Sequence, residues 1–189
     1  MNKALVILIP LVIIGVLVIG GLGIYNGLVS AQEEAKTAWA QVENQYQRRA
    51  DLIPNLVETV KGYAKQEKSI LEEVTRLRSQ WGEARQSGNI NKSLQAAQGL
   101  ESALARLMVV VERYPELKSN QNFMKLQDQL EGTENRISVE RRRYNQSVMN
   151  YNKKIRTFPG AFFAGPFGFE RMSLFEAEAG AKKAPAVKF

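Results

Sequence analysis

The fold of this chain is decided by residues 4–24, which read ALVILIPLVIIGVLVIGGLGI. This run carries no charge and no strongly polar side chain. A helix that rises about 1.5 Å per residue needs about 20 such residues to cross the hydrocarbon core of a bilayer. We therefore expect an uncleaved transmembrane anchor from Ala4 to Ile24. A cleaved signal peptide is the alternative, although it would have a shorter apolar region and a small-residue cleavage site.

The composition excludes several classes of chemistry. The chain of 189 residues contains neither cysteine nor histidine. Disulfides, iron–sulfur clusters and thiol catalysis are therefore excluded, and so is the Glu-x-x-His motif of di-iron carboxylate proteins. The commonest general base and transition-metal ligand is also missing. Because the sequence holds no nucleophile with its base, no phosphate-binding loop and no metal-ligand set, we expect no cofactor, no metal and no enzymatic activity.

Apolar residues recur every three or four positions after Ser30, which predicts amphipathic helices rather than strands. The first break is expected near Ala50. Pro54 would cost about 3 kcal/mol inside a helix, and Asp51 is a suitable N-cap for a new one. Gly88 with Asn89 and then Pro115 mark the later breaks. The predicted helices cover residues 30–50, 52–86, 92–114 and 120–156.

These elements predict an all-α fold, in which an N-terminal transmembrane helix precedes an antiparallel four-helix up-down bundle with coiled-coil-like seams. The alternative is a three-helix bundle whose first helix is kinked at Pro54. The predicted segments are a short flank at 1–3, the anchor at 4–25, the bundle at 26–156 and a tail at 157–189.

Six charged residues form the first candidate site, an inter-helix polar network. Glu67 and Glu140 occupy positions on apolar stripes where a hydrophobic residue is expected. A buried carboxylate without a partner is unfavourable, so we expect arginines of neighbouring helices to pair with them and fix the helix register. A site for an anionic ligand or a carboxylate-bound metal is the alternative. The network comprises Arg48, Arg49, Asp51, Glu67, Glu140 and Arg141.

The second candidate site is basic and aromatic. The net charge is +7, and most of it lies between Arg136 and Arg156. In an up-down bundle, the end of the last helix returns to the membrane, where basic side chains meet anionic headgroups and aromatic rings settle at the interface. The alternative is that these basic residues simply form a solvent-exposed helix face. The membrane-surface candidates are Lys153, Lys154, Arg156, Phe158, Phe162 and Phe163.

The tail from Thr157 holds every phenylalanine except Phe123, mixed with glycine and proline. Those residues forbid a long helix, and so many aromatic side chains require a partner. The tail can fold back over the bundle, or it can bind lipid or another subunit. Nucleic-acid binding is not expected, because no stacking platform or groove-reading motif is present.

Several motifs resemble the LemA family: YNGLV (25–29), QRRADLIPNLVETVKGYA (47–64), YPELKS (114–119), YNQSVMNYN (144–152) and RTFP (156–159). The likeness covers nearly the whole chain, although the family's tails carry fewer phenylalanines after the Phe-Pro pair. The resemblance implies a membrane helix with a four-helix bundle, a true break at Pro54 and no established catalytic activity.

From these observations we expect a membrane-anchored, non-enzymatic scaffold or adaptor of the bacterial cell envelope. Its location would be the cell (inner) membrane as a single-pass protein. Lys3 is the only charged side chain before the anchor, and the Lys and Arg count near the two ends of the span predicts that the bundle lies outside the cytoplasm. The expected partners are membrane lipids and an unidentified envelope protein, and self-association into a homo-oligomer stays open. Binding of anionic lipid, or membrane organisation, is the alternative function, and an enzyme is the weaker one.

Overall fold

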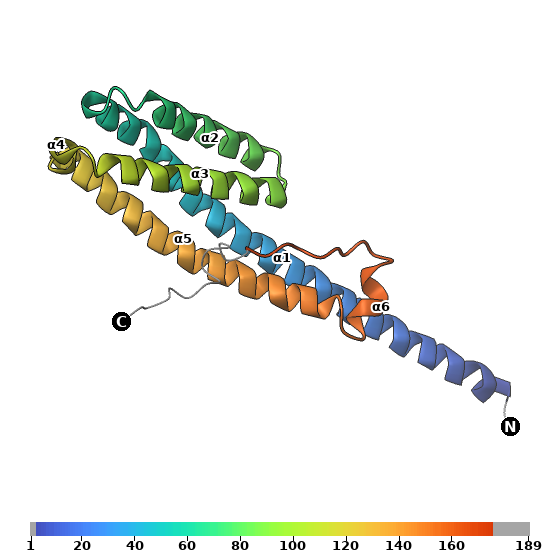
Figure 1. Cartoon of the computed structure of the whole chain (residues 1–189). Coiled ribbons are helices and arrows are strands. Elements are labelled where there is room, and N and C mark those ends of the chain that lie inside the picture. The colour runs from blue at the N-terminus through green and yellow to red at the C-terminus, as the bar shows by residue number, and fades with distance from the viewer. Residues whose placement is uncertain (1–2, 176–189) are drawn as a thin grey trace, which may run out of the picture. The chain divides into compact units, whose positions relative to one another are not determined.

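Helices are the only regular secondary structure in the residues that the structure describes, which are 3–175 of a computed structural model (Figure 1). The prediction of an all-α protein with an apolar N-terminal helix is confirmed. The up-down order of a four-helix bundle stays a prediction. The helices are α1 (Lys3–Tyr63), α2 (Lys68–Gln86), α3 (Ile90–Val111), α4 (Pro115–Lys118), α5 (Gln121–Lys154) and α6 (Gly160–Ala164).

Helix α1 passes through Pro54 without interruption, so the predicted break near Ala50 is wrong. Pro54 cannot donate a hydrogen bond to the carbonyl of Ala50, but Arg78 on α2 donates its Nε to that oxygen at 2.8 Å. Ile53 and Leu56 flank the proline and are buried. The hydrogen bond from Arg78 and the burial of these side chains together offset the penalty of proline in a helix.

The chain reverses instead at residues 64–67, between α1 and α2. The helix predicted over 52–86 is therefore two helices, and the three-helix alternative is not observed either. The Glu67 carboxylate accepts hydrogen bonds from Arg113 at 2.9 Å and from the Tyr114 hydroxyl at 3.0 Å. Gln66 donates to the same hydroxyl at 3.1 Å. Glu67 interrupts the apolar stripe because it lies in a connection, where its carboxylate is held from the far end of α3.

The remaining helix boundaries follow their turn signals. Gly88 adopts a left-handed φ of 65°, which a residue with a side chain rarely adopts, and the chain then restarts as a helix. The Asn89 side chain caps α3 by accepting from the backbone N–H of Lys92 at 3.1 Å. Pro115 begins the short α4. Helices α3 and α5 therefore lie close to the predicted ranges 92–114 and 120–156.

The chain divides into two compact units, and α1 and α5 contribute residues to both. The anchor unit combines residues 3–38 with residues 144–175. The bundle unit is built from Trp39–Arg143. The core of the anchor unit consists of Leu28, Ala31, Tyr151, Ile155, Ala164 and Phe169. The largest buried side chains of the bundle unit include Tyr46, Trp81, Leu100, Leu107 and Phe123.

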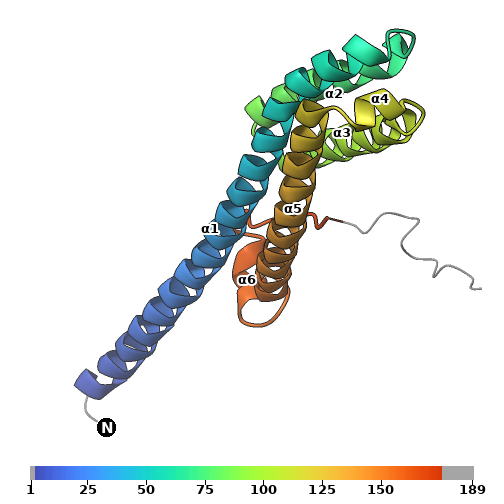
Figure 2. The same ribbon diagram turned by 90° about the vertical axis from the view of Figure 1, so that its left-hand side faces the viewer.

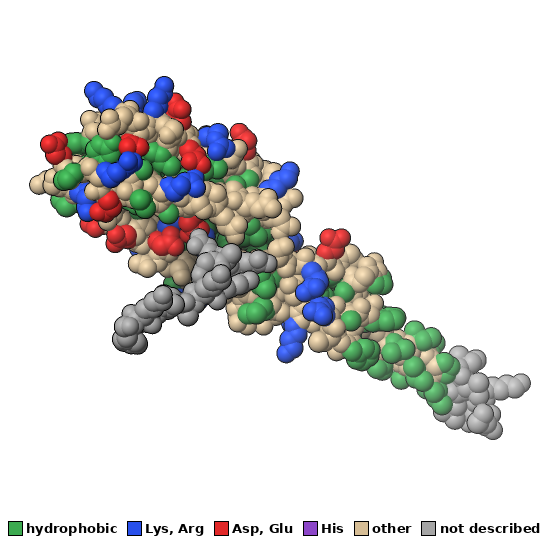
Figure 3. Space-filling view, viewed as in Figure 1, with side chains coloured by type: hydrophobic (Ala, Val, Ile, Leu, Met, Phe, Trp, Pro, Cys, Tyr) green, Lys and Arg blue, Asp and Glu red, His purple; other side chains and the backbone are tan. Residues whose placement is uncertain are grey.

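The N-terminal part of α1 is long and apolar enough to span a membrane, and none of its most apolar stretch is buried. Ile19, for example, is 73% exposed. Hydrophobic side chains cover this end of the molecule (Figure 3). Among residues 3–175, no other helix is both long enough and apolar enough to cross a membrane.

Candidate functional site

A buried arginine is the centre of the polar cluster in the bundle unit. Arg49 lies on α1 and is only 4% exposed. Its guanidinium pairs with Glu134 on α5, donates to the Thr133 hydroxyl at 3.5 Å and lies 3.9 Å from the Glu101 carboxylate on α3. A buried charge of this kind is tolerated only when it is paired and hydrogen-bonded. Arg49 therefore ties α1 to both α3 and α5.

A second arginine completes the cluster. Arg141 on α5 donates to the Glu101 carboxylate and to the Tyr46 hydroxyl, and its guanidinium lies 5.5 Å from the centre of the Tyr46 ring. Burial, together with the negative charge of Glu101, raises the pKa of Tyr46 to about 12. Burial alone would lower the pKa of Arg141, but Tyr46 and Glu101 outweigh it and raise that pKa. Both groups therefore keep one protonation state at neutral pH.

The six residues of the predicted polar network do not form one site. Arg49 and Arg141 meet through Glu101. Glu67 lies at the α1–α2 connection, with Arg113 and Tyr114 as its partners.

Three of the six lie outside both groups. Glu140 pairs with Arg143, one turn along its own helix at 2.9 Å, rather than with a neighbouring helix as expected. Arg48 and Asp51 are exposed, and Asp51 accepts a hydrogen bond from Gln47 at 2.7 Å. The structure thus brings together two of the six residues and separates the others.

Four members of the observed cluster are absent from the predicted network, namely Tyr46, Glu101, Thr133 and Glu134. Tyr46 and Thr133 lie at the helical spacing of apolar core positions, so spacing alone does not mark them as polar-site residues. Glu101 and Glu134 each follow a seam residue directly, so their positions at the stripe edge resemble those of ordinary surface charges. The signal that could have found them is the polar Thr133 on a seam, with a carboxylate beside it.

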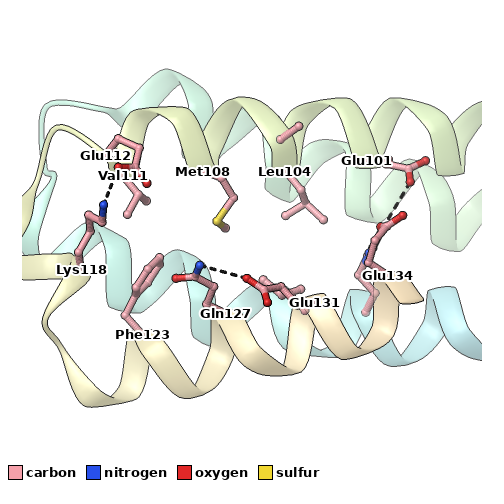
Figure 4. Close-up of a pocket in the computed structure, with 13 residues that line it drawn as sticks. Glu101, Leu104, Met108, Val111, Glu112, Lys118, Phe123, Gln127, Glu131 and Glu134 are labelled. Carbon is pink, nitrogen blue, oxygen red and sulfur yellow. Dashed lines mark hydrogen bonds and ion pairs between the residues drawn. The ribbon is translucent and has the colours of Figure 1, made fainter. Parts of the chain in front are cut away.

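A groove of about 460 Å³ lies between α3 and α5 in the bundle unit (Figure 4). Its floor is apolar and includes Leu104, Met108, Val111, Phe123 and Leu130. The Arg49 cluster closes one end, and an ion pair of 2.6 Å between Lys118 and Glu112 closes the other. An apolar floor with charged ends is the composition typical of grooves that bind amphipathic segments. Among residues 3–175, no group of three His, Cys, Asp or Glu side chains could hold a metal ion.

A different surface lies in the anchor unit, where the end of α5 meets α1. Lys154 donates its Nζ to the carbonyl of Gly27 at 3.4 Å, directly after the apolar span. Lys153 and Arg156 are exposed. Helix α6 lies beside α1 in both views of the ribbon (Figures 1 and 2). Gly160, the first residue of α6, has no room for a side chain because the Lys154 carbonyl would lie 2.2 Å from a Cβ atom.

The aromatic side chains after α5 are divided between buried and exposed positions. The Phe163 ring contacts Gly21 of the apolar span, and the Phe167 ring centre lies 5.1 Å from that of Tyr25. Phe158 and Phe162 are 88% and 75% exposed. Two of the membrane-surface candidates, Lys154 and Phe163, thus lie beside the anchor. The contact of all six candidates with lipid stays a prediction.

The rest of the described tail folds back along α5. Asn152 both donates to and accepts from the backbone of Met172, at 2.8 Å and 3.0 Å. Asn145 makes the same pair of bonds to Phe175, at 3.1 Å and 2.9 Å. The Tyr144 and Tyr151 hydroxyls donate to the carbonyls of Ser173 and Glu170. The repeated Tyr-Asn pairs of YNQSVMNYN therefore hold the tail backbone. Phe189 lies outside the described residues.

Comparison with known proteins gives consistent matches. The sequence model of the LemA family matches residues 38–189. Magnetosome protein MamQ 2 of Paramagnetospirillum magneticum is 29% identical over 175 residues, which cover 80% of this chain and 64% of that protein. Magnetosome protein MamQ of Magnetospirillum gryphiswaldense is 29% identical over 174 residues with the same coverage. The match thus spans less than two thirds of the length of these relatives. Protein LemA of Metamycoplasma hominis is 23% identical over 178 residues, which cover 93% of this chain and 80% of that protein.

Proposed function

The chain belongs to the LemA family, and we propose that it is a membrane-anchored, non-enzymatic helical scaffold or adaptor of the bacterial cell envelope. The observation that carries this proposal is the continuity of α1, which runs from Lys3 to Tyr63 without a break. The apolar span and core residues of the bundle unit therefore belong to one helix, which suits a membrane-tethered protein that presents a folded helical surface.

The polar clusters support a structural role rather than catalysis. Arg49, Arg141 and Glu101 satisfy one another, and Glu67 is held by Arg113 and Tyr114. Such closed ion pairs fix helix register and leave no group poised for proton transfer. An enzymatic function would be revived by turnover that disappeared in Glu67→Gln or Glu140→Gln.

The groove between α3 and α5 is the surface that we propose for a protein partner. A photo-crosslinking residue in place of Ala105, which lines the groove and is exposed, should give a discrete covalent adduct with an envelope protein in cells. The same residue in place of Gln80, which is exposed on α2, is the matched control. Equal adducts from both positions, or none from Ala105, would contradict the adaptor role.

We further propose that the protein lies in the inner membrane with the bundle unit outside the cytoplasm. Lys3 is the only charged residue before residue 33, whereas the chain beyond the span carries many charges of both signs. The chain has no cysteine, so Ser79→Cys introduces a single thiol at an exposed position of α2. A membrane-impermeant maleimide should label it in spheroplasts without permeabilisation. Labelling only after permeabilisation would place the bundle unit inside the cytoplasm.

Contact with the membrane surface is a second proposed function, and the anchor unit supports it. Lys154 reaches Gly27 at the end of the span, and the exposed Phe162 belongs to the same unit. A polarity-sensitive fluorophore on Phe162→Cys in the reconstituted full-length protein should emit as in an apolar medium and be quenched by lipid-borne quenchers. The same fluorophore on Ser119→Cys in the bundle unit should emit as in water. Similar emission from both sites would remove this function.

A further inference from the structure

An apolar groove of about 470 Å³ lies in the anchor unit, between the membrane span and the aromatic segment that follows α5. One wall is formed by the span, including Leu17, Gly21 and Tyr25, and the other by Phe163 and Phe167. We infer that this groove binds one acyl chain of an anionic phospholipid, whose headgroup is held by Lys154 and Arg156. The inference rests on the proposed function, in taking residues 4–24 to lie in the bilayer.

The side chains that line the groove are suited to a linear apolar ligand. The rings of Phe163 and Phe167 are stacked with an interplanar angle of 15° and a centroid distance of 6.2 Å. Gly21 faces them, and a Cβ at that position would lie 3.4 Å from the Phe163 ring. Glycine therefore lets the Phe163 ring lie close to the span, and a larger side chain at this position would push the ring away or occupy the groove. At the depth of a membrane span such a space is lined by hydrocarbon rather than water, which makes an acyl chain its natural occupant.

The positive charges near this end of the anchor indicate that the lipid headgroup is anionic. Residues 4–32 carry no charge, and residues 153–169 carry only Lys153, Lys154 and Arg156. The Lys154 ammonium lies 3.4 Å from the carbonyl of Gly27, two residues beyond the Tyr25 that ends the groove. Glu33 and Glu170 follow these two segments, so Lys154 is the charge that lies directly beyond the apolar groove. It complements the phosphate of a lipid whose chain occupies the groove. Each basic residue near an anionic headgroup should strengthen binding about fivefold.

The test is lipid titration of the full-length protein by native mass spectrometry after delipidation. Phosphatidylglycerol and phosphatidylcholine with identical acyl chains are the probes. We expect phosphatidylglycerol to bind more tightly, and the double variant Lys154→Gln, Arg156→Gln to lose about 25-fold in affinity for it. The control variant Lys65→Gln, Lys68→Gln removes two exposed charges of the bundle unit and should not change the affinity for either lipid.

The groove itself is tested by a pair of glycine variants. Gly21→Leu should weaken binding of both lipids because its side chain fills the groove. Gly20→Leu adds the same side chain where no atom lies within 4 Å of a Cβ, and it should bind as the wild type does. Circular dichroism of each variant verifies that the helices have formed.

Three results would overturn the inference. These are equal affinities for the two lipids, identical behaviour of the two glycine variants, and a dimer that dissociates only in Gly21→Leu, since a second copy would then occupy the groove. A different measurement tests the proposed membrane anchor. If alkaline carbonate extracted the wild-type protein from membranes, the anchor itself would be refuted, whereas loss of lipid selectivity in a protein that resists extraction refutes only the lipid site.

Discussion

At the scale of single residues, the hydrogen bond from Arg78 to the carbonyl of Ala50 decides whether α1 can pass through Pro54. Proline leaves that carbonyl without its intrahelical donor, and Ala50 is buried. Arg78→Met keeps most of the side-chain length and leaves the acceptor unpaired. We expect it to lower the free energy of unfolding by about 1–3 kcal/mol, measured by chemical denaturation of the full-length protein in detergent.

The same hydrogen bond can be isolated by a double-mutant cycle. In a Pro54→Ala background, the new backbone N–H can bond to Ala50, so Arg78→Met should cost clearly less than it does beside proline. Arg76→Met, on an exposed position of the same helix, should be nearly neutral in both backgrounds. Equal costs of Arg78→Met with and without Pro54 would refute the assignment.

Tyr46 predicts the behaviour of the bundle unit at high pH. Its folded-state pKa is raised from 10.0 to about 12 by burial and by Glu101. Between these two values the Tyr46 hydroxyl is ionised in the unfolded chain but still protonated in the folded protein. The unfolded state is therefore favoured increasingly as the pH rises from about 10 to about 12. Stability should fall by about 1.4 kcal/mol per pH unit there. In thermal melts at pH 8 to 12, Tyr46→Phe should be less stable at pH 8 but show a shallower decline above pH 10. An unchanged slope would contradict this.

At the scale of elements, side chains of α5 hold the tail through hydrogen bonds to its backbone, in addition to the packing of Phe169 and Phe175. Asn145 and Asn152 each exchange two hydrogen bonds with one tail residue. Asn152→Ala removes one such pair, so hydrogen exchange of the Met172 amide should accelerate about tenfold or more. Exchange measured by mass spectrometry on a peptide covering residues 165–175 tests this. The matched control is Asn150→Ala, because the Asn150 side chain accepts a hydrogen bond from Gln146 on its own helix. Equal acceleration in both variants would refute the role of Asn152.

The elements also show how far sequence patterns reach in this protein. Apolar length and helical periodicity suffice for the anchor and for the helices themselves, because both depend on neighbouring residues. The end of α1 was mispredicted because the donor that tolerates Pro54 comes from Arg78 on another helix. Arg49 and Arg141 could be recognised as candidate inter-helix residues. Their partner Glu101 could not, since its burial depends on how α1, α3 and α5 pack.

At the scale of the whole molecule, the anchor is part of a folded unit rather than a detachable tether. Leu28 lies in the core with Tyr151, Ile155 and Ala164, while Gly21 and Tyr25 face the aromatic segment. These two sets of contacts require a fixed rotation of α1 between residues 21 and 28. The apolar sequence of residues 4–24 does not predict these contacts, because a hydropathy pattern carries no information about helix rotation.

This register can be broken without changing composition or hydrophobic length. One alanine inserted after Asn26 rotates the span by about 100° relative to Leu28 and shifts it by about 1.5 Å. The protein should remain in the membrane, because the apolar run is intact, but Gly21 should turn away from Phe163. We expect the fluorophore at position 162 to change its emission and the preference for phosphatidylglycerol to be lost. The same alanine inserted beside Gly88, in the connection between α2 and α3, should leave both properties unchanged. If the insertion after Asn26 had no effect on either, the anchor would be a simple tether, and the lipid groove would not depend on the rotation of α1.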